Sequence, residues 1–324
     1  MIKSIRYLFG YYKEYGIKCT IAYYLCILFP YSEKKRNSWR QKILKYKYKT
    51  LSNYLYKYFT QSTQNKQKNN NCESAFDGII WTAWLQGEEN APEVIRITLA
   101  SMRENANGHP VIVISNENVE QYIDIPKAIK TKHESGKMSH AHYADVIRMM
   151  ILAKYGGLWL DATTFLSKPI SEDAFKASFY SVGFKNVSAG KYISGGKWLV
   201  GLIGGKKGSI YISFISEMLS FYWKEHQVPI DYFVYDYLIW NLYQNDKSFC
   251  SLIESLPRME YHTNALRRII NESFDKGRME SLLIDKQIYI LSYRGEYTKK
   301  TPEGNMTLYG YLFNHYLGEQ SEGE

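Results

Sequence analysis

The sequence has little cysteine and little proline for its 324 residues, and it has no long apolar run. Its eight prolines suggest short loops. Its four cysteines are widely separated and form no CxxC pair, which argues against a zinc site and against a disulfide framework. We expect them to be free thiols in a reducing cytosol. They are Cys19, Cys26, Cys72 and Cys250.

What is present is ordinary globular composition, with 45% hydrophobic and 23% charged residues. This excludes a disordered chain, a collagen-like fibre and a coiled-coil rod. The charge, however, is unevenly placed. Residues 1–70 hold 15 Lys and Arg against two acidic residues, whereas the remainder holds 26 basic and 30 acidic residues. The chain therefore has a basic N-terminal region, and the rest of it is close to neutral.

The N-terminal region is rich in tyrosine and lysine. Its best apolar stretch, residues 17–31, is shorter than the roughly 20 apolar residues that a membrane-spanning helix needs. It also lacks the small-residue cleavage site of a secretory signal. Aromatic rings next to basic side chains suit a bilayer surface of anionic lipid. A helical hairpin packed on the body and a nucleic-acid contact are the alternatives, although no nucleic-acid-binding motif supports the second.

A polar, low-complexity segment, QSTQNKQKNNN, follows at residues 61–71 and is typical of a linker. We therefore divide the chain into a basic, Tyr-rich helical region (1–60), a polar linker (61–75) and a main domain (76–318).

The main domain begins with alternating strand and helix patterns, which predict a parallel α/β sheet. Ligands of such sheets lie beyond the carboxyl ends of the strands, where Trp84 and Asp161 stand. The second half has a mixed pattern. We expect strands at 78–84, 111–114, 158–160, 179–182, 199–203 and 288–291, and helices at 92–105, 139–154, 210–223 and 232–243.

The most informative stretch joins three features. Asp145 and Arg148 are three residues apart and so share one face of the predicted helix. Gly156-Gly157 allows a tight turn. Asp161 then emerges from an apolar strand, where a carboxylate is costly unless it is paired or coordinates something. Together they suit a sugar diphosphate and its cation. Alternatively, Asp145 and Arg148 form a surface pair and Asp161 caps a turn.

The block DxxR…YGGxWxD resembles the sugar-binding region of DXD-motif glycosyltransferases, most closely that of bacterial capsular polysaccharide synthesis proteins, relatives of glycosyltransferase family 32. The opening strand IIWTAWLQG, residues 79–87, resembles the same family. The resemblance covers residues 77–170 well and residues 195–245 more loosely. It implies a GT-A-like, Rossmann-like α/β fold and a nucleotide-sugar donor.

The resemblance also implies roles for individual residues. Trp81 would stack on the base, Asp145 and Arg148 would hold hydroxyls of the donor sugar, and Trp159 would line the pocket. The alternative for Trp81 and Trp84 is core packing of at least one of them, since residues three apart on a strand face opposite ways. Asp161 would be the first Asp of the DXD motif, contacting ribose or the metal. The implied donor-binding set is Trp81, Thr82, Ala83, Asp145, Arg148, Gly156, Gly157, Trp159 and Asp161.

The sequence departs from the family pattern in two places. Thr163 replaces the second Asp of the DXD motif, and a late His-Lys-Leu segment is replaced by Tyr-Ile-Leu-Ser at residues 289–292. The expected metal, Mn²⁺ or Mg²⁺, would lie at Asp161 and Thr163, since a departing diphosphate must be neutralised.

The expected catalytic residues are Asp161 and Arg148, with Asp231 and Asp236 on the acceptor side unless these two cap or flank a helix. Lys206 or Lys207 is a further candidate for stabilising the leaving diphosphate.

We therefore expect a retaining glycosyltransferase that uses a UDP-sugar and extends a capsular or other surface polysaccharide on a polyprenyl-linked acceptor. It would lie in the cytoplasm, peripherally at the inner face of the plasma membrane, and would not bind nucleic acid. Hydrolysis or epimerisation of the nucleotide sugar is a rival activity, and a non-catalytic sugar- or lipid-binding accessory protein is the alternative from another class.

Overall fold

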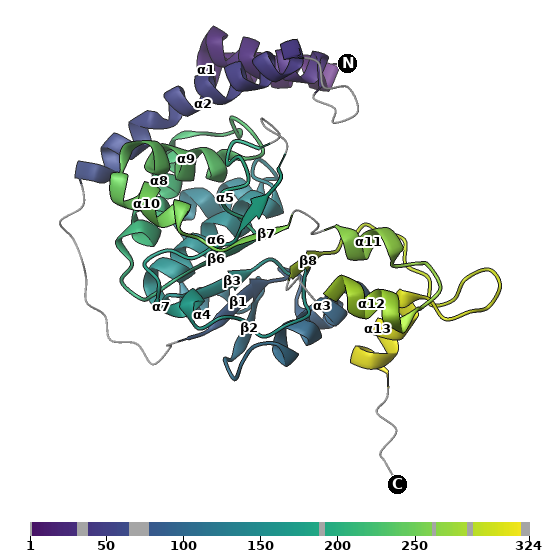
Figure 1. The fold of residues 1–324 in the computed structure, drawn as a ribbon. Coiled ribbons are helices and arrows are strands. Elements are labelled where there is room, and N and C mark those ends of the chain that lie inside the picture. Colours follow the sequence, from purple (N-terminus) through teal and green to yellow (C-terminus); the bar gives the residue numbers. More distant parts are fainter. Residues whose placement is uncertain are drawn as a thin grey trace.

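A computed structural model describes residues 2–30, 38–64, 78–187, 192–260, 264–283 and 288–318, with side chains from residue 7 onward. A helical hairpin of α1 (Ile2–Leu28) and α2 (Ser38–Gln64) lies across a mixed α/β body (Figure 1). The α/β class and the helical N-terminal region are thus confirmed, while the GT-A type of fold stays a prediction.

A four-stranded sheet forms the centre of the body, in the order β2-β1-β3-β6. Strand β1 pairs in parallel with β2 and β3, whereas β6 pairs antiparallel with β3. The sheet is therefore mixed and not wholly parallel as predicted. Its strands are β1 (Ile80–Ala83), β2 (Val111–Ile114), β3 (Gly157–Leu160) and β6 (Leu202–Gly205).

Two apolar cores cover the two faces of this sheet, because successive side chains of a strand point to opposite faces. Trp81, Trp159 and Ile203 belong to one core, and Ile80 and Leu158 belong to the other. The first core is formed with α6 (His140–Tyr155), α8 (Ile210–Glu225) and α9 (Val234–Asn245), and the second with α3 (Glu93–Glu104) and α13 (Leu308–Leu317).

Shorter elements complete the body. Two small sheets pair β4 with β8 and β5 with β7. These strands are β4 (Thr164–Leu166), β5 (Gly183–Lys185), β7 (Arg258–Glu260) and β8 (Ile288–Ile290). The remaining helices are η1 (Glu88–Asn90), α4 (Val119–Tyr122), α5 (Lys127–Glu134), α7 (Asp173–Lys176), α10 (Lys247–Glu254), α11 (Ala265–Ile269) and α12 (Lys276–Leu283).

Two strand predictions in the second half are corrected. Residues 179–182 do not form a strand; Tyr180 makes only an isolated bridge to Gly204. The strand predicted at 199–203 is shifted to Leu202–Gly205. Its two glycines are needed there, because a Cβ at Gly204 would lie 2.7 Å from the carbonyl oxygen of Ala174. A crowded neighbour, which is not visible in sequence, thus placed this strand.

The hairpin packs on the body through its tyrosines. Tyr11 and Tyr58 are fully buried, and the Tyr11 hydroxyl donates a 2.6 Å hydrogen bond to the carbonyl oxygen of Ile230. Helix α2 runs to Gln64, so the first four residues of the predicted linker are helical, and residues 65–75 lie outside the described residues. None of the described helices is both long and apolar enough to cross a membrane.

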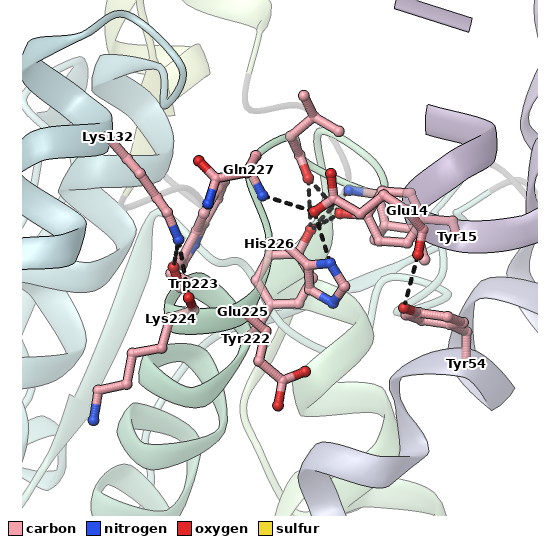
Figure 2. Close-up of polar contacts among 12 residues, drawn as sticks. Glu14, Tyr15, Tyr54, Lys132, Tyr222, Trp223, Lys224, Glu225, His226 and Gln227 are labelled. Atoms are coloured by element: carbon pink, nitrogen blue, oxygen red, sulfur yellow. Dashed lines mark hydrogen bonds and ion pairs between the residues drawn. The ribbon is translucent and has the colours of Figure 1, made fainter. Parts of the chain in front are cut away.

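The hairpin is also attached at the end of α8 (Figure 2). The Glu14 carboxylate of α1 accepts hydrogen bonds from the backbone N–H of Gln227 at 2.7 Å and contacts Nδ1 of His226 at 2.8 Å. On the other side of this end, the Lys132 ammonium of α5 donates to the last carbonyls of α8, those of Trp223 and Lys224. A cation at a helix C-terminus stabilises it.

Candidate active site

A cavity of about 420 Å³ opens at the carboxyl ends of β1 and β3. Its volume falls within the range of small-molecule sites, roughly 300–1,000 Å³. Its lining includes Ala83, Trp84, His140, Asp145, Arg148, Trp159, Asp161, Thr163, Tyr232, Phe233, Tyr235, Asp236 and Tyr293.

Arg148 is the central charge of this cavity, and its side chain is only 4% exposed. Its Nη2 donates to Oδ1 of Asp161 at 2.6 Å, and its Nη1 donates to the carbonyl oxygen of Val200 at 2.5 Å and lies 3.4 Å from Asp145. The guanidinium lies near the rings of Trp159 and Tyr235, at 5.3 and 5.5 Å from their centroids. Such stacking favours arginine over lysine.

Local sequence explains how Arg148 and Asp145 reach the cavity. Ser139 caps α6, accepting a hydrogen bond from the backbone N–H of His142, and the apolar residues of the helix pack into the core. The polar pair is left on the side that faces the strand ends. The alternative of a solvated surface pair is excluded, because Arg148 is buried.

Asp161 follows β3 directly and remains open to the cavity, with 42% of its side chain exposed. Besides Arg148, its Oδ1 accepts a 3.0 Å hydrogen bond from Nε1 of Trp159. Gly201 makes room for it, since a Cβ there would lie 2.8 Å from Oδ2. The carboxylate is therefore oriented by two hydrogen-bond donors, Arg148 and Trp159, and remains partly accessible.

Burial sets the electrostatics of the site. It raises the pKa of Asp145 to about 7, with Arg148 opposing this effect and Asp161 adding to it. Burial disfavours the charged form of Arg148, but Asp161 and Asp145 outweigh it and raise its pKa, so the guanidinium stays charged. Among the described residues its Nε has no hydrogen-bond partner.

A third carboxylate and an aromatic rim complete the cavity. Asp236, on α9, accepts a 3.0 Å hydrogen bond from Nε1 of Trp198, and burial raises its pKa to about 7. Tyr232 and Phe233 are exposed at the mouth, and Tyr293 packs edge-on against Trp84. These rings offer apolar faces to a planar or sugar-like ligand.

The donor set fits a divalent cation only in part. Asp161 contributes one carboxylate and Thr163 one hydroxyl, and no group of three or more His, Cys, Asp or Glu side chains suited to a metal occurs in the described part of the chain. Mg²⁺ is commonly held by one or two carboxylates plus substrate phosphates. The predicted pair, Asp161 and Thr163, therefore fits a cation whose remaining ligands come from a diphosphate and water.

Four predicted donor-binding residues lie outside the cavity, which corrects their expected placement. Trp81 is fully buried in the core and donates through Nε1 to the carbonyl oxygen of Gly156 at 3.0 Å, so its ring does not reach a base. Thr82 is also fully buried. Gly156 and Gly157 lie at the amino end of β3, where Cβ atoms would collide with the backbones of Lys207 and Ile79.

Three further candidates are also placed elsewhere. Asp231 is buried and its Oδ2 pairs with Lys47 of α2 at 2.7 Å, so it faces the hairpin and not the cavity. Lys206 and Lys207 stand beside Gly156, at the amino end of β3, away from the cavity at its carboxyl end. Of the four predicted catalytic residues, the structure brings together Asp161, Arg148 and Asp236.

Sequence reasoning missed several aromatic residues of the cavity. Tyr235 lies beside Arg148, Tyr232 and Phe233 form the mouth, and Tyr293 comes from a segment far along the chain. Tyr235 directly precedes Asp236 on α9, and adjacent helix residues do not share a face, so spacing did not point to Tyr235. No local signal pointed to Tyr293, which follows β8.

Comparisons with known proteins agree with the resemblance. The O-glycosyltransferase braB of Annulohypoxylon truncatum is 26% identical to this chain over 105 residues, which are 30% of this chain and 25% of that protein. The matched part is thus about a quarter of that relative's length. A family model described as capsular polysaccharide synthesis protein matches residues 32–312, well over half of the chain. The chain belongs to the capsular polysaccharide synthesis protein family.

Proposed function

We propose that this protein is a glycosyltransferase that moves a sugar from a UDP-sugar to a growing capsular or other surface polysaccharide carried on a polyprenyl lipid, with retention of configuration. The single observation that carries the proposal is the buried Arg148–Asp161–Asp145 cluster at the cavity. Its family and the O-glycosyltransferase name of the relative support a transferase role in polysaccharide synthesis.

The cluster suits the polar half of such a donor. Carboxylates accept hydrogen bonds from sugar hydroxyls, and Asp145 and Asp161 lie on either side of the guanidinium. Arg148 supplies the positive charge that a diphosphate requires. Trp84, whose ring faces the cavity beside Tyr293, takes the base-contacting role first expected of Trp81.

The reaction breaks the bond between the anomeric carbon and a phosphate oxygen, and the electron pair leaves with the phosphate. A new bond forms between that carbon and an acceptor hydroxyl oxygen. Negative charge grows on the departing diphosphate, and Arg148 is preorganised to stabilise it. In a retaining transfer the acceptor approaches from the same face, so its proton passes to the departing phosphate oxygen.

Asp236 is the acceptor-side group in this proposal. It lines the same cavity as Asp161, and its pKa of about 7 means that both protonation states are populated near neutral pH. It can therefore accept a hydrogen bond from the acceptor hydroxyl when ionised, and donate one to it when protonated. A divalent cation held by Asp161 and Thr163 would add Lewis-acid neutralisation of the diphosphate.

The test is a panel of nucleotide sugars incubated with the protein and a polyprenyl-diphosphate-linked sugar, with and without Mn²⁺, while nucleotide release is measured. One donor should be consumed faster with acceptor present, and Asp161→Asn should reduce this rate at least about 100-fold. Release that ignores the acceptor would indicate a hydrolase. Binding of a donor without any release would indicate the accessory protein and would overturn the proposal.

A further inference from the structure

The hairpin has an outer surface that its packing on the body leaves uncovered. Helix α1 bends at Gly16, whose φ of 75° favours glycine, and each half turns apolar side chains outward. Its exposed large side chains are Tyr7, Leu8, Phe9, Tyr12, Ile17, Ile21, Ile27 and Leu28. These residues and the exposed residues of α2 named below are called the outer face.

The apolar part of the outer face is densest at the closed end of the hairpin. Leu28 is 68% exposed, and Phe29 and Trp39 are both exposed and pack edge-on, with ring centroids 5.1 Å apart. The Arg40 guanidinium lies 5.3 Å from the Trp39 ring. A tryptophan beside an arginine is typical of a membrane–water interface. Exposing this many large apolar side chains to water is otherwise unfavourable.

Exposed basic side chains lie on α2, the helix that packs against α1. Helix α2 contains one arginine and five lysines and no acidic residue. Lys42, Lys45 and Lys49 recur at three- and four-residue spacing and are exposed, as is Tyr46. Glu14, the one carboxylate among the described residues of the hairpin, is turned inward to His226 and Gln227 (Figure 2).

We propose that the outer face docks on a bilayer of anionic lipid. Apolar side chains that insert between lipids, flanked by lysines that meet anionic headgroups, match the two halves of such a surface. The lysines argue against a second copy of the chain as the occupant, since lysine is depleted in protein interfaces. The exposed Ile, Leu and Phe side chains argue against nucleic acid, whose binding depends on phosphate contacts.

The hairpin also connects this surface to the mouth of the cavity. Lys47 of α2 pairs with Asp231, and the next two residues are Tyr232 and Phe233, which line the cavity. Tyr11 of α1 holds the carbonyl of Ile230 in the same segment. The hairpin that would dock on the bilayer therefore also holds the segment that leads into the cavity. The docking itself does not depend on the proposed sugar transfer.

The experiment is co-sedimentation of the full chain with vesicles of phosphatidylcholine alone or with 30% phosphatidylglycerol, so that only the second set carries anionic headgroups. The protein should bind the anionic vesicles and lose about 100-fold in affinity on the triple change Lys42→Glu, Lys45→Glu and Lys49→Glu, at roughly tenfold or less per lysine. Ile17→Ser with Ile21→Ser should weaken binding without a change in charge.

The matched control reverses three exposed lysines of the body by Lys127→Glu, Lys176→Glu and Lys276→Glu. It should bind the vesicles as the unmodified protein does. The proposal is overturned if both triple variants lose binding equally, because attraction would then follow net charge alone. It is also overturned if the unmodified protein does not sediment with anionic vesicles, or if Ile17→Ser with Ile21→Ser instead dissociates a dimer measured by light scattering.

Discussion

Two ion-pair clusters, one at the hairpin and one at the cavity, differ in what they leave unsatisfied. At the hairpin, Lys47 and Asp231 are both nearly buried, and the Tyr237 hydroxyl also donates to Asp231. In the cavity, Arg148 meets Asp161, but its Nε has no partner within the described residues and Asp161 is 42% exposed. A cluster closed on itself stabilises the fold, whereas one with accessible groups beside a cavity is equipped to bind a ligand.

Arg148→Ala should have the largest effect on activity. It removes the charge that would stabilise the departing diphosphate, so kcat/KM of sugar transfer should fall about 1,000-fold, or about 4 kcal/mol. Arg148→Lys keeps the charge but loses the planar fork and the ring stacking, so it should also lose most of the activity. Thermal unfolding of both variants checks the fold. Activity within threefold of the unmodified enzyme would contradict the assignment.

Lys47→Met should affect stability and not chemistry. Removing one partner of a buried pair leaves the Asp231 carboxylate uncompensated, so the free energy of unfolding should fall by about 3 kcal/mol. Adding Asp231→Asn should recover much of that loss, because no buried charge then remains. Urea unfolding measures both. A Lys47→Met enzyme that unfolds normally but has lost transfer activity would erase the distinction between the two clusters.

Asp236→Asn should change how stability depends on pH. The pKa of Asp236 is raised to about 7 in the folded protein by burial, above roughly 3.9 in the unfolded chain. The unfolded state therefore ionises first, and stability falls as pH rises from about 4 to about 7. The Asp236→Asn variant has no carboxylate to bury, so it should be more stable than the parent by about 4 kcal/mol at pH 8, and by much less at pH 4.

Unfolding curves at pH 4 and pH 8 would test this difference. Asp145 titrates in the same range, so the variant should keep part of the slope. If the stability of the parent and of the Asp236→Asn variant depends on pH in the same way, burial does not raise the pKa of Asp236 and the prediction is wrong.

Trp84→Ala should have the smallest effect. Loss of an aromatic surface in the cavity should raise KM for the donor three- to tenfold, or about 1 kcal/mol, with little change in kcat. Trp81→Phe is the matched control. Because Trp81 is buried in the core, this substitution should lower the stability of the fold and leave KM for the donor unchanged. Steady-state kinetics separate the two. A higher KM for Trp81→Phe alone would restore the base-stacking role first expected of it.

How far sequence could predict this structure depended on whether the deciding contact was local. Helix α6, its Ser139 cap and the strand that ends at Asp161 were predictable, because periodicity and capping act within a few residues. The choice between Trp81 and Trp84 was not, because both suit a buried strand and only tertiary packing decides which ring is covered. The pairing of Asp231 with Lys47, 184 positions away, was equally invisible.

The most direct test of the central claim is calorimetric titration of UDP, and of GDP for comparison, into three proteins: the unmodified chain, Arg148→Lys, and the double variant Lys47→Met with Asp231→Asn. We predict that the unmodified chain and the double variant bind the same nucleoside diphosphate with similar Kd, and that Arg148→Lys binds it at least about tenfold more weakly. Absence of binding to the unmodified chain, or equal Kd for Arg148→Lys, would contradict the claim that this cluster holds a diphosphate.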